Sequence, residues 1–487
     1  MKGTRVGFIA IAVVAFLVFH PRIAASQGHS APDSLTSAEF WAFFTSMSEP
    51  DGSFLSENFV SNEVSFQDVI PTLQKTLTKD GVYLGVGPEQ NFTYISNLGP
   101  RLAVIFDIRR QNAMQHLMYK ALFELSPTRA EFVSRLFSRP SVARIAAGID
   151  VKALFDSAAA APVSDSAYKA NFAAIVELLT RQHGFVLPEA DIQSISHVYE
   201  VFFKAGTDVN YGYRSGRPSM PTTYPTFGML QAATNADTVQ MAFLANEDRY
   251  RAVRSLQLKN LIVPVVGDFG GPSAIKSVAK WLRERSLMVT TFYVSNVEQY
   301  LWRESGSAER FYSNVSALPI DTTSHFIRSV PRSPTTMPIR TMGTAPLQAF
   351  GYSISTDAKG NVTTQTFRDS AGIMLVQTTI DSSGSRRTQV TRDSAGIARA
   401  VDTFRTFRDS MAVSPDSSLK RMMARRDSII AATSQWQVPS GVTMQVVMGG
   451  SLTSGIASMD KTLKSYFLGE LKTYGSVVEM TKVTGWR

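Results

Sequence analysis

The stretch Gly81-Val-Tyr-Leu-Gly-Val-Gly-Pro-Glu-Gln90 decides the fold of this chain. Residues 81–86 are mostly apolar and predict a short buried strand, and the turn at Gly85 and Gly87 leads into the start of a helix. Glycines at such a turn let a ligand approach the main chain, and the helix start favours negative charge. We therefore predict that a Rossmann-like α/β domain opens at this loop.

A second strand follows and ends in an acidic residue. Leu102 to Phe106 is entirely apolar, as expected of a parallel strand that is covered on both faces. The next residue, Asp107, has the place of the acid that follows the glycine turn in nucleotide-binding sheets, where a carboxylate can accept hydrogen bonds from ribose hydroxyls. The third glycine of the dinucleotide fingerprint would fall at Gln90, and a bulky residue there disfavours an NAD site.

Two later strands also end in polar residues. The strand at 261–266 is followed by Asp268, and the strand at 288–294 by Asn296 and Glu298. The helix predicted between them completes an alternation of strands and helices that favours a doubly wound sheet. Asn296 is a candidate for orienting a substrate, and Glu298 for a general base or a helix cap. Each of these residues is also compatible with a turn or cap in any α/β sheet.

The remaining polar residues form no recognisable catalytic or metal-binding pattern. Arg109 and Arg110 suit a 2′-phosphate, but arginines are also common on the surface after a strand. The histidines lack metal-ligand spacing, and there is no Gly-x-Ser-x-Gly elbow, phosphate-binding Gly-Lys-Ser/Thr loop or His-Glu-x-x-His motif. We therefore predict no metal site.

Composition narrows the class of protein further. The chain has no cysteine, which excludes disulfides, thiol catalysis and cysteine-ligated zinc. Its formal charge of +9 is spread along the sequence without a basic block that could follow a phosphate backbone. We therefore expect no nucleic-acid partner. The sequence does not indicate an oligomeric state.

The first residues predict export. Lys2 and Arg5 precede an apolar run at Val6–Phe19, and small residues follow at Ala24-Ala-Ser26. This is the pattern of a secretory signal peptide, and the run is shorter than the roughly 20 residues of a membrane span. We interpret residues 1–26 as a signal peptide or an uncleaved anchor. Either one would place the protein outside the cytoplasm, with no other membrane segment expected.

The rest of the chain divides into four parts. Residues 27–34 form a linker, and 35–330 form the α/β domain, with a helical insertion at about 128–205. Residues 331–440 are rich in Ser, Thr, Arg and Asp and predict a partly disordered insertion, after which 441–487 returns to the α/β domain.

Two local patterns add detail to this division. Thr36-Ser-Ala-Glu39 reads as a capping box and predicts a helix start. Within the polar insertion, Arg368-Asp-Ser-Ala-Gly-Ile373 recurs at Arg392–Ile397, and the alternation at 363–380 predicts one β-hairpin. Two full copies are too few for a stable solenoid.

Several long blocks carry a resemblance to known sequences: Glu57–Glu63, Gly81–Tyr94, Phe106–Asn112, His116–Glu124, Asn260–Phe269, Phe292–Leu301 and Lys472–Met480. Together they resemble an uncharacterised bacterial family typified by a leptospiral hypothetical protein with a class I methyltransferase-like fold. The similarity covers roughly 36–330 and 461–481.

The resemblance implies a pocket that binds S-adenosylmethionine or a related nucleoside. In that arrangement Asp107 holds the ribose, Asp268 meets the adenine amino group, and Asn296 and Glu298 face the substrate. Gly85 and Gly87 let the backbone approach the ligand. The first hypothesis is therefore an exported methyltransferase-like protein. A non-catalytic envelope binding protein that reuses the fold is the alternative, and an NAD(P)-dependent oxidoreductase is a weaker one.

Overall fold

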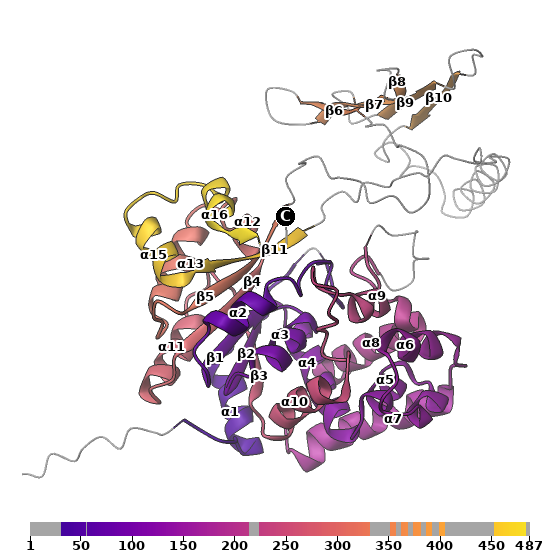
Figure 1. The fold of residues 1–487 in the computed structure, drawn as a ribbon. Coiled ribbons are helices and arrows are strands. Elements are labelled where there is room, and N and C mark those ends of the chain that lie inside the picture. The colour runs from indigo at the N-terminus through magenta and orange to yellow at the C-terminus, as the bar shows by residue number, and fades with distance from the viewer. Residues whose placement is uncertain are drawn as a thin grey trace, which may run out of the picture. The chain divides into compact units, whose positions relative to one another are not determined.

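The computed structural model describes residues 31–54, 56–213, 224–331 and 452–483, together with five strands between 351 and 404 (Figure 1). The signal segment predicted at residues 1–26 lies outside the described residues, as does most of the linker predicted at 27–34. The chain divides into two compact units, one of residues 1–333 and 447–487 and one of residues 334–446.

The larger unit is an α/β structure built on a seven-stranded mixed sheet, in the order β12-β11-β5-β4-β1-β2-β3. Strands β5, β4, β1, β2 and β3 run parallel, β11 is antiparallel to β5, and β12 is antiparallel to β11. The strands are β1 Val82–Val86, β2 Leu102–Asp107, β3 Ile262–Val266, β4 Val289–Ser295, β5 His325–Pro331, β11 Leu452–Ser458 and β12 Lys482–Val483. The order 3-2-1-4-5 of the parallel strands is compatible with a Rossmann-like fold.

The four strands predicted between Gly81 and Val294 are all present, and their bounds differ only slightly from the expected ones. Strands β2 and β3 are buried along their whole length, which explains their unbroken apolar sequences. In the register of the sheet Val86 lies opposite Phe106, and Asp107 lies opposite Val266. The carboxyl ends of β1, β2 and β3 therefore meet at one edge of the sheet.

Helices surround the sheet and connect its strands. Helix α1 begins with the predicted capping box, in which Thr36 and Glu39 satisfy each other's backbone N–H groups. The α-helices are α1 Ser37–Met47, α2 Ile70–Thr76, α3 Gln90–Leu98, α4 Arg110–Leu125, α5 Arg129–Phe137, α6 Val151–Ala160, α7 Asp165–Glu177, α8 Glu189–Ala205, α9 Phe227–Ala232, α10 Glu247–Leu258, α11 Ala274–Glu284, α12 Val297–Leu301, α13 Ser307–Ser316, α15 Met459–Phe467 and α16 Tyr474–Met480. Short helical turns occur at Pro140–Arg144, Leu178–Gln182 and Gly206–Asp208.

The helices fall into two packed sets. In the first set, helix α4 contacts α5, α8 and α10, and α10 contacts α3. In the second set, α11 contacts α1 and α13, and α13 contacts α15. Figure 1 shows α3, α4 and α10 on one side of the strands and α11, α13 and α15 on the other. The segment expected as a helical insertion at about 128–205 contains α5 to α8. It packs on α4 through aromatic rings that include Phe123, Phe132 and Phe202.

The smaller unit contains a five-stranded antiparallel meander in the order β10-β9-β8-β7-β6. Its strands are β6 Gly351–Thr356, β7 Val362–Arg368, β8 Met374–Ile380, β9 Arg386–Thr391 and β10 Arg399–Phe404. The hairpin predicted at 363–380 is present as β7 and β8, but the sheet continues on both sides of it. The partial disorder predicted for 331–440 stays a prediction, because the residues between and beyond these strands lie outside the described residues.

Candidate functional site

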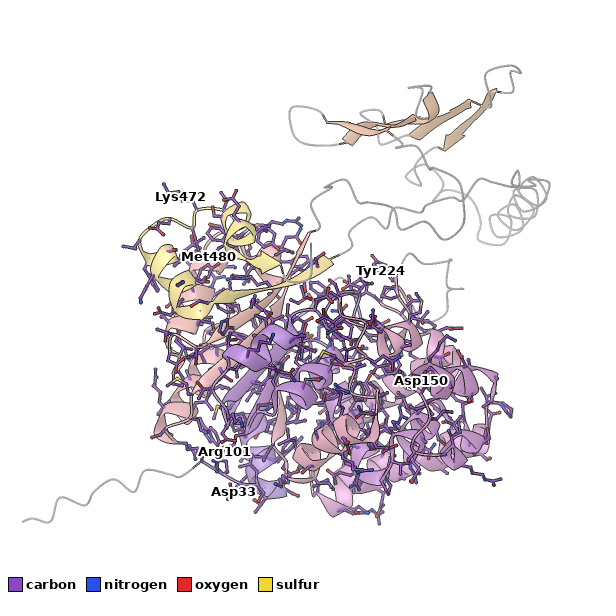
Figure 2. The ribbon with its side chains drawn as sticks, viewed as in Figure 1. Asp33, Arg101, Asp150, Tyr224, Lys472 and Met480 are labelled. Atoms are coloured by element: carbon purple, nitrogen blue, oxygen red, sulfur yellow. The ribbon has the colours of Figure 1, made fainter. Side chains whose placement is uncertain are left out.

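A cavity of about 720 Å³ lies at the carboxyl ends of the parallel strands. Its lining includes residues at the ends of β1, β2 and β4 and in the loop after β3. The strand order reverses between β1 and β4, and open α/β sheets bind ligands at such a point. Figure 2 labels Tyr224, which lines the cavity, at the opposite end of the unit from Arg101 and Asp33 near the amino end of β2.

The structure brings together most of the predicted site residues. The cavity is lined by Gly87, Asp107, Asp268 and Asn296. Gly85 and Glu298 are not among the lining residues. Four of the six candidates, one from the end of each of β1, β2, β3 and β4, therefore share one cavity, and the other two have different surroundings.

The two glycines of the β1 loop have different roles. Gly87 has a φ of +76°, and a Cβ added there would meet no atom within 4 Å. At Gly85 an added Cβ would lie 1.9 Å from Asn91 Oδ1 and 2.7 Å from a ring carbon of Tyr83. Gly87 therefore leaves open space beside the cavity, whereas Gly85 allows helix α3 to pack closely on β1. The prediction that Gly85 admits a ligand is wrong in this respect.

The loop after β1 is held in place by hydrogen bonds from helix α3. Asn91 Nδ2 donates to the carbonyl oxygens of Val86, Gly87 and Pro88 at 2.9, 3.2 and 2.7 Å. Its Oδ1 accepts from the Tyr83 hydroxyl at 2.8 Å. A loop fixed by this many bonds presents its backbone in one arrangement to whatever enters the cavity.

Alanine substitutions should separate the two glycines. Gly85→Ala is expected to lower the free energy of unfolding by about 2 kcal/mol, because Asn91 is too well bonded to move aside. Gly87→Ala is expected to cost about 1 kcal/mol, the strain of a left-handed alanine. Urea unfolding of both variants measures the difference. Equal losses would contradict the packing role of Gly85.

His116 supports the same loop from helix α4. Its Nε2 donates to the Gly87 carbonyl oxygen at 2.8 Å, and its ring lies edge-on to Phe92. Burial lowers the pKa of His116 to about 4, so the ring is neutral at neutral pH. Of the two neutral tautomers, the one with its proton on Nε2 can donate to the loop.

His116 should make the protein sensitive to acid. Between pH 6.5, the ordinary pKa of His, and pH 4 the unfolded chain binds a proton that the folded chain does not. The free energy of unfolding therefore decreases as the pH is lowered through this range. The contribution lost at pH 5 is about 2 kcal/mol. His116→Gln keeps an N–H donor and is expected to unfold with a shallower acid dependence in urea titrations at pH 7 and pH 5. Parallel curves for the two proteins would refute this assignment.

Asp107 lines the cavity as the salt-bridge partner of Arg109. Its Oδ1 accepts from the Arg109 backbone N–H and Nε, both at 2.9 Å, and its Oδ2 accepts from Nη2 at 2.7 Å. A carboxylate offers about four acceptor positions, so one remains, on Oδ2. Arg109 Nη1 also donates to the carbonyl oxygens of Ser56 and Glu57. These bonds fix the segment between the cavity-lining residues Phe54 and Asn58.

Asp268 and Asn296 face the cavity with polar atoms to spare. Asp268 Oδ1 accepts from the Gly270 N–H at 2.9 Å, which forms the turn after β3. Asn296 makes a long contact of 3.5 Å with Gln299. Both side chains are half-buried, so a ligand in the cavity can reach them.

Glu298 does not face a substrate, which corrects the prediction of a general base. It is 1% exposed and forms a salt bridge with Arg328, at 2.5 Å between Oε2 and Nε and 3.0 Å between Oε1 and Nη2. The Tyr312 hydroxyl donates to Oε1 at 2.7 Å. A carboxylate with these partners joins α12, β5 and α13, and it is not available to take a proton from a ligand.

Glu63 is a cavity residue that the sequence prediction missed. It lies before α2 in a segment without regular structure, and it is 1% exposed. The Tyr293 hydroxyl and Ser295 Oγ donate to Oε1 at 2.7 and 2.6 Å, and Gln90 Nε2 and Ser454 Oγ donate to Oε2 at 2.8 and 3.3 Å. Its presence in a block of family resemblance was the one signal in the sequence that could have found it.

His183 and His197 lie outside the cavity and have structural partners. His183 bridges Ser37 and Glu124, which links α1 to α4, and His197 contacts Glu57 at 2.6 Å. Within the described residues no group of three or more His, Asp and Glu side chains is arranged to hold a metal ion. In the same part of the chain no helix is long and apolar enough to cross a membrane.

Comparison with known proteins identifies the family of the chain without giving it a function. No curated protein matches the sequence. A family model described as a domain of unknown function, DUF7790, matches residues 58–400, a range that begins just before Glu63 and includes the cavity-lining ends of β1 to β4. Because the matched range is more than half of the chain, this protein belongs to the DUF7790 family.

Proposed function

We propose that this protein binds S-adenosylmethionine or a related nucleoside in the cavity and has a sheet of the class I methyltransferase type. The observation that carries the proposal is that Gly87, Asp107, Asp268 and Asn296 line one cavity at the point where the strand order reverses. Strand β11, which is antiparallel to β5, and strand β12 beyond it are also compatible with such a sheet.

The cavity offers the polar groups that a nucleoside needs. Asp107 retains an acceptor position for one ribose hydroxyl, and Asp268 has an oxygen free of intramolecular bonds among the described residues for a base amino group. The open space at Gly87 lets the ligand lie against the backbone. A cavity of about 720 Å³ is within the range that holds molecules of this size.

The oxidoreductase alternative has less support. Gln90, which replaces the third glycine of the dinucleotide fingerprint, is buried and donates to Glu63 and to the Tyr94 hydroxyl. Arg109 and Arg110, the candidates for a 2′-phosphate, bind Asp107 and Asp191. These side chains already form hydrogen bonds and salt bridges within the protein, so they are not available to bind the phosphates of a dinucleotide.

Calorimetry on the full chain tests the proposal. S-adenosylmethionine and its demethylated product S-adenosylhomocysteine are expected to bind, and Asp268→Asn is expected to weaken both by about tenfold or more, because a charged hydrogen bond is lost. Asp248→Asn, at an exposed position on α10, is the matched control and should leave binding unchanged. Absence of heat with either ligand on the folded protein would overturn the proposal.

A non-catalytic binding protein remains the second candidate. Glu298, the candidate general base, forms a buried salt bridge with Arg328 and is not available to a substrate. Methyl transfer can proceed by positioning alone, so the missing base does not exclude an enzyme. The two candidates differ in turnover. Radiolabelled methyl groups from S-adenosylmethionine should reach a component of the host extract if the protein is an enzyme, and should stay on the donor if it only binds.

We also propose that the protein works outside the cytoplasm, on the basis of the apolar run at Val6–Phe19 after Lys2 and Arg5. A C-terminal fusion to a reporter that is active only outside the cytoplasm should be active. Activity of a reporter that works only inside the cytoplasm would contradict export.

A further inference from the structure

Glu63 brings a negative charge into the cavity wall without a cationic partner. Its four hydrogen-bond donors are two hydroxyls from β4, one amide from α3 and one hydroxyl from β11, and all four are neutral. Among the described residues no Lys, Arg or His lies within salt-bridge distance of Glu63, in contrast to the paired Asp107. A buried charge with neutral partners is costly to the fold, so it is expected to serve a ligand.

The donors also determine what kind of ligand can use this charge. Each oxygen of Glu63 already accepts two hydrogen bonds, which fills the roughly four acceptor positions of a carboxylate. A ligand with N–H groups would have to displace one of these donors. A sulfonium or quaternary ammonium has no N–H group and needs only the charge, so it fits without displacement.

The rest of the cavity favours a positive charge as well. Its lining includes the carboxylates Asp268 and Glu304, and the one arginine among the described lining residues, Arg109, is neutralised by Asp107. Aromatic rings also line it, among them Tyr293 and the edge-on pair Phe54 and Tyr300, with ring centroids 5.3 Å apart. Aromatic rings attract onium cations through their faces.

We infer that the part of the cavity formed by Glu63, Tyr293 and Ser295 is a subsite for an onium cation. The inference deepens the proposed function and rests on it for one source of that cation, the sulfonium of S-adenosylmethionine. The other source is a quaternary ammonium on a separate small molecule. Both sources present the same chemistry, a cation surrounded by carbon, to the same carboxylate.

Two ligand pairs, each with a charged and a neutral member, test this inference on the full chain. Choline is compared with its neutral isostere 3,3-dimethylbutan-1-ol, and S-adenosylmethionine is compared with the neutral thioether S-adenosylhomocysteine, which also lacks the transferable methyl group. The charged member of at least one pair is expected to bind about tenfold more tightly. Glu63→Gln, which keeps the shape of the side chain, is expected to reduce that preference to about twofold or less. If neither pair shows a charge preference, or if the preference survives Glu63→Gln, the inference is wrong.

A second variant covers the case in which Glu63→Gln does not fold. Ser454→Ala removes the longest of the four donors and leaves one acceptor position on Oε2. Ethanolamine, which has N–H groups, should bind more weakly than choline to the unaltered protein and should approach choline in Ser454→Ala. An unchanged ratio would count against the inference.

The arms also separate this inference from the proposed function. A choline preference without any binding of S-adenosylmethionine, S-adenosylhomocysteine or adenosine leaves the cation subsite intact and removes the nucleoside proposal. Equal binding of S-adenosylmethionine and S-adenosylhomocysteine, with no choline preference, leaves the nucleoside proposal intact and removes the cation subsite.

Discussion

Arg328→Met is expected to lower the free energy of unfolding by about 3–5 kcal/mol, because it leaves the buried charge of Glu298 without its partner. Both side chains are 2% exposed, and the Arg328 guanidinium also lies 4.5 Å from the ring centroid of Phe326. Among the described residues Glu298 would keep a single hydrogen-bond donor, the Tyr312 hydroxyl. Urea unfolding at pH 7 measures the loss.

Two controls show whether the loss comes from the unpaired charge. The double variant Glu298→Gln with Arg328→Met removes both charges and keeps an acceptor for Tyr312, so it is expected to recover most of the stability. Lys280→Met breaks an exposed pair with Glu284 and should change stability by less than about 1 kcal/mol. If Arg328→Met behaves like Lys280→Met, Glu298 is not held by this pair, and its role as a base must be considered again.

The parts of the site that the sequence predicts are those at strand ends. A buried parallel strand is a run of apolar residues, so β1, β2, β3 and β4 are visible in the sequence. Their carboxyl ends meet at one edge, which places Gly87, Asp107, Asp268 and Asn296 together without any knowledge of side-chain contacts. The sheet therefore predicts which residues are neighbours, but not what each side chain bonds to.

The parts that the sequence does not predict depend on contacts between distant segments. Glu63 lies outside any helix or strand, and its donors include Ser454, 391 residues away. The sequence position of Glu298 after a strand predicts a residue that faces a substrate. In the structure Glu298 instead pairs with Arg328 on β5, which lies 30 residues further along the chain. The pattern of apolar and polar residues in one segment does not show which distant residue a side chain will contact. A carboxylate on a loop or after a strand therefore has the same sequence pattern whether or not it is paired in the fold.

Only one hairpin of the meander in the smaller unit, at 363–380, is predicted from the sequence. Two full copies of Arg-Asp-Ser-Ala-Gly-Ile are too few for a stable solenoid and do not by themselves indicate further strands. The sequences that link the strands share a wider pattern, Asp-x-x-Gly, which recurs at equal intervals at Asp357, Asp369, Asp381 and Asp393. Turn residues such as Asp and Gly at a short, regular interval are typical of an antiparallel sheet with one strand between successive turns.

Glu89→Gln is expected to raise the free energy of unfolding by about 3 kcal/mol at pH 7. Glu89 lies at the start of α3, directly after the loop that lines the cavity, and is 1% exposed. Its Oε1 accepts from the Ser61 N–H at 3.3 Å, and its Oε2 has no hydrogen-bond partner among the described residues. Burial raises the pKa of Glu89 from 4.5 to about 8, so the folded protein holds it protonated.

The sign of the effect follows from the proton count. Between pH 4.5 and pH 8 the folded chain binds a proton at Glu89 that the unfolded chain releases, so stability falls as the pH rises through this window. Glutamine removes this dependence and keeps the acceptor for Ser61. Unfolding curves of the two proteins should therefore nearly coincide at pH 4 and separate towards pH 8, whereas Glu479→Gln, an exposed control on α16, should follow the unaltered protein throughout.

Curves of the two proteins that stay parallel from pH 4 to pH 8 would contradict the raised pKa of Glu89.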